Sequence, residues 1–109
     1  MDSLTEFTFE NAVSKDVSVV LFSGQKCPAC VLFKPVFEKV SSETPGVKFF
    51  VVDAHDNLQL ADKHGIASIP QMIMFKDGKE KSRLVGFHGP ADFVHWLALD
   101  EKGQREAGS

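Results

Sequence analysis

Only two cysteines occur among the 109 residues, and the chain has neither a long apolar run nor a block of like charge. No stretch approaches the roughly 20 apolar residues of a membrane span. The formal net charge is -3, and the scattered charges give no footprint for nucleic acid or a membrane surface. The opening residues MDSLTEFTFE show neither the basic start nor the apolar centre of a secretory signal. We therefore expect a cytoplasmic protein that binds neither nucleic acid nor a membrane.

What the chain does have is apolar content. Hydrophobic residues make up 43% of it and include ten phenylalanines, enough for a chain of this length to bury one core without a covalent staple. We expect one domain over residues 1–101. The end of the chain, residues 102–109, has nothing to bury and is expected to be a disordered tail.

Helix and strand patterns alternate along the chain. Phe33, Phe37 and Val40 share one helical face, whereas the β-branched run VSVVLFS is typical of a strand covered on both sides. In the stretch DNLQLADKHG, Asp56 is the expected N-cap of a helix that ends at Gly65. The patterns predict helices over Phe7–Val13, Cys27 to about Ser41, Asp56–Gly65 and from Gly89 onward, and strands over Val17–Ser23, Val47–Asp53, Gln71–Phe75 and the run after Gly78, with a further short strand possible at Leu4–Thr8.

This order predicts an α/β fold with a mixed central sheet of four to five strands and helices on both faces. Strands joined by helices are expected to run parallel. The Asp77-Gly78 pair between two strand-like runs predicts a hairpin, so the last two strands are expected to be antiparallel.

Cys27 and Cys30 are separated by two residues, a spacing with several uses. A zinc site needs four ligands, but there is no third cysteine and the four histidines lack a ligand spacing, so we predict no metal site. Four-cysteine iron–sulfur binding within one chain is excluded by count, whereas a cluster shared between chains is not. As a staple, a loop of about four residues contributes only about 2 kcal/mol. A disulfide that contributes so little can open and close without unfolding the protein, as a redox reagent must.

The expected helix start favours redox chemistry. Free N–H groups there, with the neighbouring Lys26, stabilise a thiolate at Cys27, which we predict to be the nucleophile. Pro28 suits the first helical turn. Cys30, one turn further in, is expected to be more buried and to resolve the mixed disulfide formed by Cys27.

The chain resembles the thioredoxin family from about Leu4 to Leu99. The resemblance is carried by VVLFSGQ before the cysteines, CPAC with Pro35 five residues beyond it, VKFFVVDA, HGIASIPQMIMFKDGK and LVGF. It implies a thioredoxin fold, a redox-active disulfide between Cys27 and Cys30, and a cis peptide bond at Ile69–Pro70. It also implies that Ile69, Pro70 and Gly86 contribute to substrate binding and that no cofactor is needed.

The sequence departs from thioredoxins in three places. The Pro28-Ala29 dipeptide, with Lys26 before the first cysteine, is closer to the Cys-Pro-x-Cys motif of glutaredoxins. Leu21 replaces a buried aspartate, and Phe49 replaces the lysine often found near it. Because both members of a buried ion pair are replaced by apolar groups, the change indicates a repacked core. It leaves Cys30 without the usual buried proton acceptor.

The favoured function is therefore that of a thiol–disulfide oxidoreductase, a monomeric protein-disulfide reductase that passes electrons from a reductase or glutathione to protein disulfides. Three alternatives remain open at this point. One is a thioredoxin-fold binding module or subunit whose cysteines are idle, another is glutaredoxin-like glutathione-dependent activity, and the third is a shared iron–sulfur or metal carrier.

Overall fold

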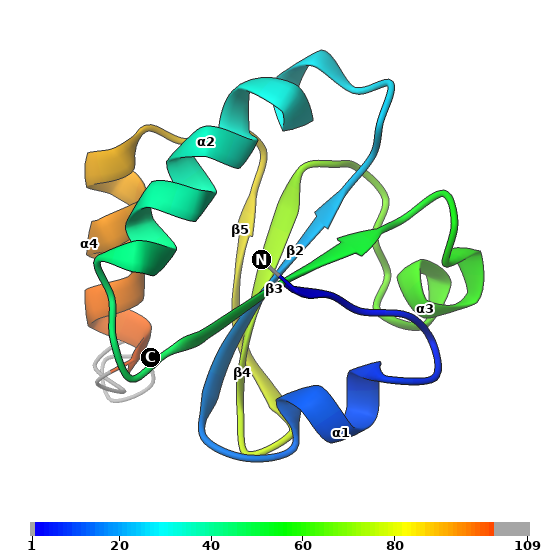
Figure 1. Cartoon of the computed structure of the whole chain (residues 1–109), viewed down its shortest axis with the longest axis horizontal. Helices are drawn as coiled ribbons and strands as arrows, with labels where there is room; N and C mark the ends of the chain where they lie inside the picture. The colour runs from blue at the N-terminus through cyan, green and yellow to red at the C-terminus, as the bar shows by residue number, and fades with distance from the viewer. Residues whose placement is uncertain (1, 102–109) are drawn as a thin grey trace.

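The structure, a computed structural model, describes residues 2–101, with side chains described over 2–99; the expected tail at 102–109 lies outside these residues. One five-stranded sheet has the order β1-β3-β2-β4-β5 (Figure 1). The strands are β1 (Asp2–Ser3), β2 (Val17–Ser23), β3 (Lys48–Asp53), β4 (Gln71–Lys76) and β5 (Lys79–Val85), and the helices are α1 (Phe9–Val13), α2 (Pro28–Ser42), α3 (Leu58–Lys63) and α4 (Pro90–Glu101).

Helices cover both faces of the sheet, as expected, and two apolar cores result (Figure 1). Alternate residues of β2 point to opposite faces, so Leu21 enters one core and Phe22 the other. The first core joins the sheet to α2 and α4 through Phe33, Phe37, Val40, Phe93, Trp96 and Leu97. The second joins it to α1 and α3 through Phe9, Val13 and Leu60.

The sheet is mixed, but the expected direction of one strand was wrong. β1, β3 and β2 are parallel, whereas β4 is antiparallel to β2 and to β5. β4 follows a helix, yet α3 has only six residues and is therefore about 9 Å long. Such a helix cannot return the chain to the far end of the sheet, so β4 starts at the end where β3 stops.

The N-terminal segment also differs from the expectation. The strand suggested at Leu4–Thr8 does not form; β1 covers only Asp2–Ser3. Side-chain hydrogen bonds turn the chain after Leu4, because the N–H of Thr5 donates to Oγ1 of Thr8 (2.9 Å) and that of Phe7 to Oγ1 of Thr5 (3.2 Å). The first helix consequently starts at Phe9, not Phe7.

Asp56 is not the N-cap of α3; Asn57 is. The N–H groups of His55 and Asp56 instead donate to Oδ1 of Asp53, at 2.9 and 3.0 Å. The carboxylate at the end of β3 thus closes a tight turn. Gly65, with φ of +65°, follows α3 in the left-handed conformation that suits a helix end.

No helix within residues 2–101 is long and apolar enough to cross a membrane. Over the same residues, no group of three or more His, Cys, Asp or Glu side chains is placed to hold a metal ion.

Candidate functional site

The two cysteines lie at the start of α2, just after the loop that joins β2 to this helix. β2 ends at Ser23, three residues cross the end of the sheet, and α2 begins at Pro28 with Cys27 as its N-cap. The N–H of Cys30 points at Sγ of Cys27, 3.2 Å away. Pro28 occupies the first helical position, where a missing N–H costs nothing. The sulfur of Cys27 thus receives one of the free N–H groups at the start of a helix.

Cys27 and Cys30 form a disulfide, with their Cα atoms 5.2 Å apart. The two sulfurs differ in exposure: Cys27 is half-buried, whereas Cys30 is 1% exposed and packed under the first turn of α2. The partner in a thiol–disulfide exchange must reach the sulfur that it attacks or is attacked by. Of the two sulfurs, that of Cys27 is therefore the one open to a protein substrate.

The loop before β4 faces the disulfide. The Ile69–Pro70 peptide bond is cis, and the carbonyl oxygen of Ile69 lies 3.8 Å from Sγ of Cys27. In the disulfide that sulfur has no hydrogen, so the separation is a contact; in the dithiol the thiol can donate across it. Gly86 is brought to the same place, since its N–H donates to the carbonyl oxygen of Pro70 at 2.8 Å.

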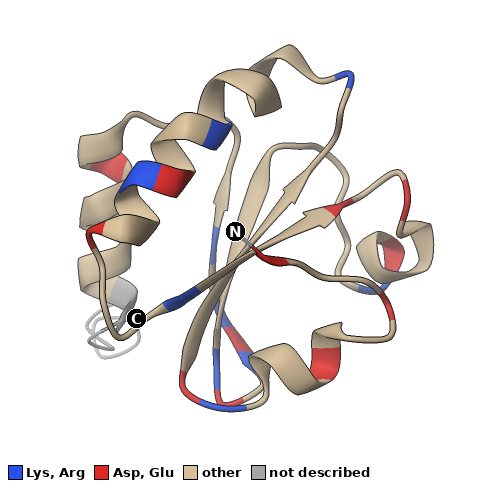
Figure 2. Cartoon of the chain, viewed as in Figure 1, with Lys and Arg blue, Asp and Glu red and all other residues tan. Residues whose placement is uncertain are grey.

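Lys26 and Ala29 frame the motif. Lys26 is exposed in the turn before Cys27, and Ala29 is half-buried. The first turn of α2 carries no acidic residue, and Figure 2 shows a basic residue in the turn that leads into α2 and uncharged residues over its start. The local field around Cys27 is therefore set by a cation and the helix N-terminus, both of which favour a thiolate.

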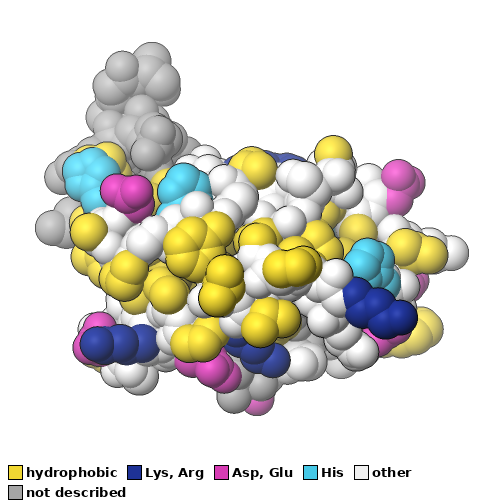
Figure 3. All heavy atoms as spheres, turned by 90° about the horizontal axis from the view of Figure 1, so that it is seen from above, with side chains coloured by type: hydrophobic (Ala, Val, Ile, Leu, Met, Phe, Trp, Pro, Cys, Tyr) yellow, Lys and Arg dark blue, Asp and Glu magenta, His cyan; other side chains and the backbone are white. Residues whose placement is uncertain are grey.

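Apolar side chains are exposed on the first turns of α2 and just after β5. Val31 and Leu32 on α2 are 60% and 67% exposed, and Phe87, just after β5, is 48% exposed. Phe87 is held in place by edge-to-face contact with the buried ring of Phe33, centroid to centroid 5.8 Å. Viewed from the end where α2 begins, hydrophobic side chains gather across the middle of the molecule (Figure 3).

Gly24 is a site residue that the sequence patterns did not single out. A Cβ at this position would lie 2.8 Å from Cδ1 of Ile69 and 3.0 Å from Cε1 of His55. The side chains of Ile69 and His55 therefore both pack against the bare backbone of Gly24. The signal in the sequence was a glycine between a buried strand and the cysteines.

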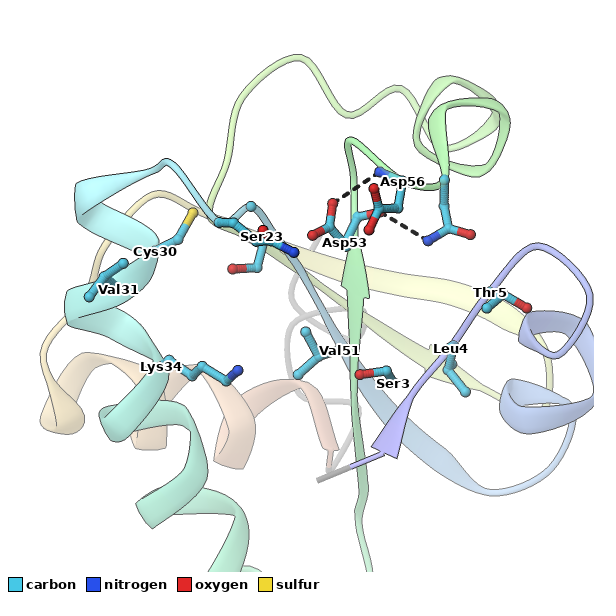
Figure 4. Close-up of a pocket in the computed structure, with 13 residues that line it drawn as sticks. Ser3, Leu4, Thr5, Ser23, Cys30, Val31, Lys34, Val51, Asp53 and Asp56 are labelled. Atoms are coloured by element: carbon cyan, nitrogen blue, oxygen red, sulfur yellow. Dashed lines mark hydrogen bonds between the residues drawn. The ribbon is translucent and has the colours of Figure 1, made fainter.

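A second feature missed from the sequence is a cavity of about 520 Å³ beside Cys30 (Figure 4). It lies between α2 and the ends of β1 and β3. Its polar and charged lining includes Ser23, Lys34, Asp53 and Asp56, and Cys30 is a lining residue whereas Cys27 is not. The cavity was hidden because three separate segments, residues 3–5, 23–34 and 51–57, build it together.

The repacked core expected around Leu21 is present. Leu21 is fully buried, and Phe49 is partly buried against the same core. The ring of Phe49 meets that of Phe37 edge to face at 5.6 Å. Apolar packing thus fills the positions at which the resemblance places a buried charge pair.

Arg83, on β5, holds the segment that leads into Pro70. Its guanidinium donates to the carbonyl oxygen of His64 and to Glu80, and Gln71, with its amide turned to satisfy both partners, accepts from Arg83 and donates to Ser68. The hydrogen bond from Arg83 lowers the pKa of Glu80, and the same bond raises the pKa of Arg83. The loop that carries Ile69 is thereby tied to the sheet.

His64 lies close to the same loop and is partly buried among aromatic rings. Its ring lies against Phe9, with centroids 4.9 Å apart, and against Phe75 at 5.6 Å. Its Nε2 is buried and has no hydrogen-bond partner within the described part of the chain. Burial, followed by the charge of Lys63, lowers the pKa of His64.

Comparison with known proteins gives one consistent answer. The family model described as Thioredoxin matches residues 1–99. The chain is 31% identical over 98 residues to a thioredoxin of Rickettsia bellii, covering 87% of this chain and 93% of that protein. It is 31% identical over 83 residues to thioredoxin-1 of Saccharomyces cerevisiae, covering 75% and 81%.

Solved structures agree with the sequence matches. The crystal structure of the Malassezia sympodialis thioredoxin superposes with a TM-score of 0.83 at 28% identity, covering 92% of both chains. The fold expected from the sequence is thus confirmed, and so is the function, because the pair of cysteines required for thiol–disulfide exchange is present and closes a disulfide. With the family model, the relatives and the disulfide in agreement, the chain belongs to the thioredoxin family of protein-disulfide oxidoreductases.

Proposed function

We propose that Cys27 attacks the substrate disulfide and that Cys30 resolves the resulting intermediate. The observation that carries this assignment is the asymmetry of the pair: Sγ of Cys27 is reachable and accepts the N–H of Cys30 at 3.2 Å, whereas Cys30 is 1% exposed. A helix N–H aimed at the sulfur stabilises its thiolate. Thiolate character and access therefore coincide at Cys27.

The reaction is a two-step exchange. The Cys27 thiolate attacks one sulfur of the substrate disulfide, forming a mixed disulfide and releasing the other substrate sulfur as a thiolate. Cys30, once deprotonated, attacks Sγ of Cys27, which releases the second substrate thiolate and closes Cys27–Cys30. The electron pair has then passed from the protein dithiol to the substrate.

We propose that the substrate lies as an extended segment beside Ile69. Ile69 presents its backbone next to Cys27, Pro70 shapes the loop, and Gly86 holds Pro70 through the 2.8 Å hydrogen bond. Backbone pairing tolerates many sequences, and the exposed side chains of Leu32 and Phe87 favour apolar residues near the substrate cysteine. This arrangement suits a range of protein disulfides.

The family implies protein disulfides as substrates and a reductase as the electron source. Beyond that, we propose that glutathione is a second source of electrons and that the protein acts as a monomer in the cytoplasm. The relatives include a mitochondrial thioredoxin-2 of Schizosaccharomyces pombe, which is 34% identical over 79 residues. Fractionation with an antibody to the untagged chain would test the compartment, and the proposal fails if the protein is found in an organelle.

The test of the assigned roles is a trapping experiment. Cys27→Ser should abolish reduction of a protein disulfide, whereas Cys30→Ser should accumulate mixed disulfides that a reducing gel converts back to free protein. The double serine variant, which should trap nothing, is the control. If Cys27→Ser traps partners and Cys30→Ser does not, the order of attack is the reverse of that proposed.

A further inference from the structure

Cys30 must lose its proton in the second step of the exchange, although its surroundings oppose a charge. A cysteine attacks a disulfide only as the thiolate. Cys30 is 1% exposed, and burial of this kind disfavours the charged form of a thiol. The positions at which the resemblance places a buried charge pair hold Leu21 and Phe49, which are apolar. The resolving step therefore needs a stabilising charge from another part of the structure.

The cavity of about 520 Å³ is the place from which such a charge can act. Cys30 belongs to its lining, as do Lys34, Asp53 and Asp56. The volume is large enough to hold water, and because Lys34 and Asp56 are exposed, the cavity is connected to solvent. The proton of Cys30 can thus pass to solvent through this cavity, although no protein substrate can reach the sulfur.

Lys34 is the cation of this lining, and it stands on the same helix as Cys30. The two residues are four positions apart on α2, a spacing that places their side chains on one face with Cβ atoms about 5–6 Å apart. In Figure 4 the side chain of Lys34 extends from α2 toward Val51 on β3. Lys34 makes no ion pair with another residue in the part of the chain that the structure describes. Its charge is therefore available to an anion at Cys30.

We propose that Lys34 promotes the resolving step by stabilising the thiolate of Cys30 across the cavity. In this step the thiol of Cys30 gives its proton to solvent, and the thiolate attacks Sγ of Cys27. The bond from Cys27 to the substrate sulfur breaks, which releases the substrate as a thiolate. The attack takes place within the protein, so Cys30 needs no opening to a partner. This assignment rests on the proposed function, because it concerns the step given there to Cys30.

Two carboxylates on the other side of the cavity act against the thiolate. Asp53 and Asp56 stand near the end of β3, as Figure 4 shows, and a nearby negative charge disfavours an anion at Cys30. However, Oδ1 of Asp53 already accepts two backbone N–H groups, at 2.9 and 3.0 Å, and Asp56 is exposed to solvent. Both negative charges are therefore partly compensated, whereas that of Lys34 has no counter-ion.

Two further titratable groups lie near the disulfide but outside the cavity lining. His55 packs against Gly24, and Lys26 directly precedes Cys27. In the resolving step Cys27 is bonded to the substrate sulfur and carries no charge, so Lys26 has no thiolate beside it to stabilise. Removal of Lys34 should consequently affect the second step and not the first.

The two steps can be separated with 2,2′-dithiodipyridine, a neutral disulfide. The reduced protein is mixed with an excess of this reagent, and the released thiopyridone is followed by its absorbance. The first release comes from attack by Cys27, and its rate rises with the reagent concentration. The second release comes from attack by Cys30 within the protein and does not depend on that concentration. Cys30→Ser should show the first release alone.

Lys34→Gln should slow the second release about threefold near neutral pH, since the lysine is exposed and its effect is screened. The first release should be unchanged. The deficit should disappear toward about pH 10, where a thiol ionises without help, and at high salt. Lys34→Arg keeps the charge and should be close to the wild type. Lys39→Gln, which removes a lysine near the end of the same helix and outside the cavity lining, should match the wild type.

Two outcomes overturn the proposal. One is an unchanged second release in Lys34→Gln. The other is a deficit that has the same size at every pH and salt concentration and persists in Lys34→Arg, since altered packing and not a lost charge would then slow the step.

Failure of this inference is distinguishable from failure of the proposed function. The trapping experiment tests the roles of Cys27 and Cys30 and does not involve Lys34. Normal trapping together with an unchanged second release in Lys34→Gln refutes the part given to Lys34 and leaves the proposed function standing. A second release that persists in Cys30→Ser shows that Cys30 is not the resolving residue, and it refutes both.

Discussion

Gly86 donates its backbone N–H to the carbonyl oxygen of Pro70 over 2.8 Å. Gly86 has φ of +87°, a conformation that side-chain-bearing residues rarely adopt. The glycine is therefore needed for the backbone geometry that lets the end of β5 hold the loop beside the disulfide. Its expected contribution to substrate binding is then indirect, through the position of Pro70.

Lys26→Gln should make the disulfide harder to reduce and the dithiol more reducing. The cation stabilises the Cys27 thiolate, which exists only in the reduced protein, so its removal lowers the reduction potential. Because Lys26 is exposed, we expect a decrease of only about 10–20 mV. Equilibration with a glutathione series followed by a thiol count measures the potential. A decrease that persists at high salt would contradict the electrostatic explanation.

Gly24→Ala should impair substrate docking. The added methyl would stand 2.8 Å from Cδ1 of Ile69, so the Ile69 side chain must move, and overpacking of this kind costs about 1–3 kcal/mol. The expected result is a higher KM for a protein disulfide together with a lower denaturation midpoint. Gly89→Ala, where a methyl meets nothing within 4 Å, is the matched control. Equal KM values for the two variants would rule out the steric argument.

Leu21→Asp should destabilise the protein strongly. Leu21 is fully buried, and an uncompensated buried carboxylate costs about 3–5 kcal/mol. In the parallel register, Leu21 pairs with Val51 and its neighbour Val19 with Phe49, so a lysine at Phe49 is within reach of the new carboxylate. The double variant Leu21→Asp, Phe49→Lys should be more stable than the sum of the single effects predicts, as urea denaturation can show. Simple additivity would mean that no ion pair forms.

His64 should make stability depend on pH in the weakly acidic range. Burial lowers its pKa below the ordinary value of 6.5, so the unfolded chain binds the proton more readily than the folded protein. The contribution of neutral His64 to stability is fully present above about pH 6.5. It is lost as the pH falls from that value through the lowered pKa of His64. The groups that face His64 are Lys63, which lowers the pKa further, Glu80, which raises it, and Arg83, which lowers it.

Urea midpoints measured between about pH 7.5 and about pH 5 test this dependence. His64→Phe keeps a ring against Phe9 and Phe75 and should flatten the profile. His95→Gln, at an exposed position on α4, should leave it unchanged. An equally steep profile in His64→Phe would assign the proton uptake to another group.

Local patterns predicted the parts of the site that depend on neighbouring residues in sequence. The start of α2 at Pro28 follows from capping and from the fixed φ of proline, and the hairpin at Asp77-Gly78 from turn chemistry. Asp56 was assigned as a helix cap in error: Asp53 accepts the N–H groups of His55 and Asp56 in a turn, and the helix begins one residue later, after Asn57. Sequence spacing does not show that the carboxylate of Asp53 forms this turn.

The parts that were missed depend on distances in space. The direction of β4 follows from the shortness of α3. The sequence pattern predicted a helix over Asp56–Gly65, which is longer than the six residues that form α3. The contact of Gly24 with Ile69 joins residues 45 positions apart, and the cavity beside Cys30 joins three segments. No periodicity within one window contains such information.

Within the part of the chain that the structure describes, β5 forms one outer edge of the sheet and pairs only with β4. Its outer row of backbone groups is a potential template for strands of other molecules. Four of its seven residues carry charge, namely Lys79, Glu80, Lys81 and Arg83. Charged side chains along an edge oppose the stacking of sheets from different molecules into fibres. The strand that opposes aggregation thus also supplies Arg83, which holds the loop beside the disulfide. Replacing the charged residues of β5 by neutral ones should therefore lower the solubility of the protein.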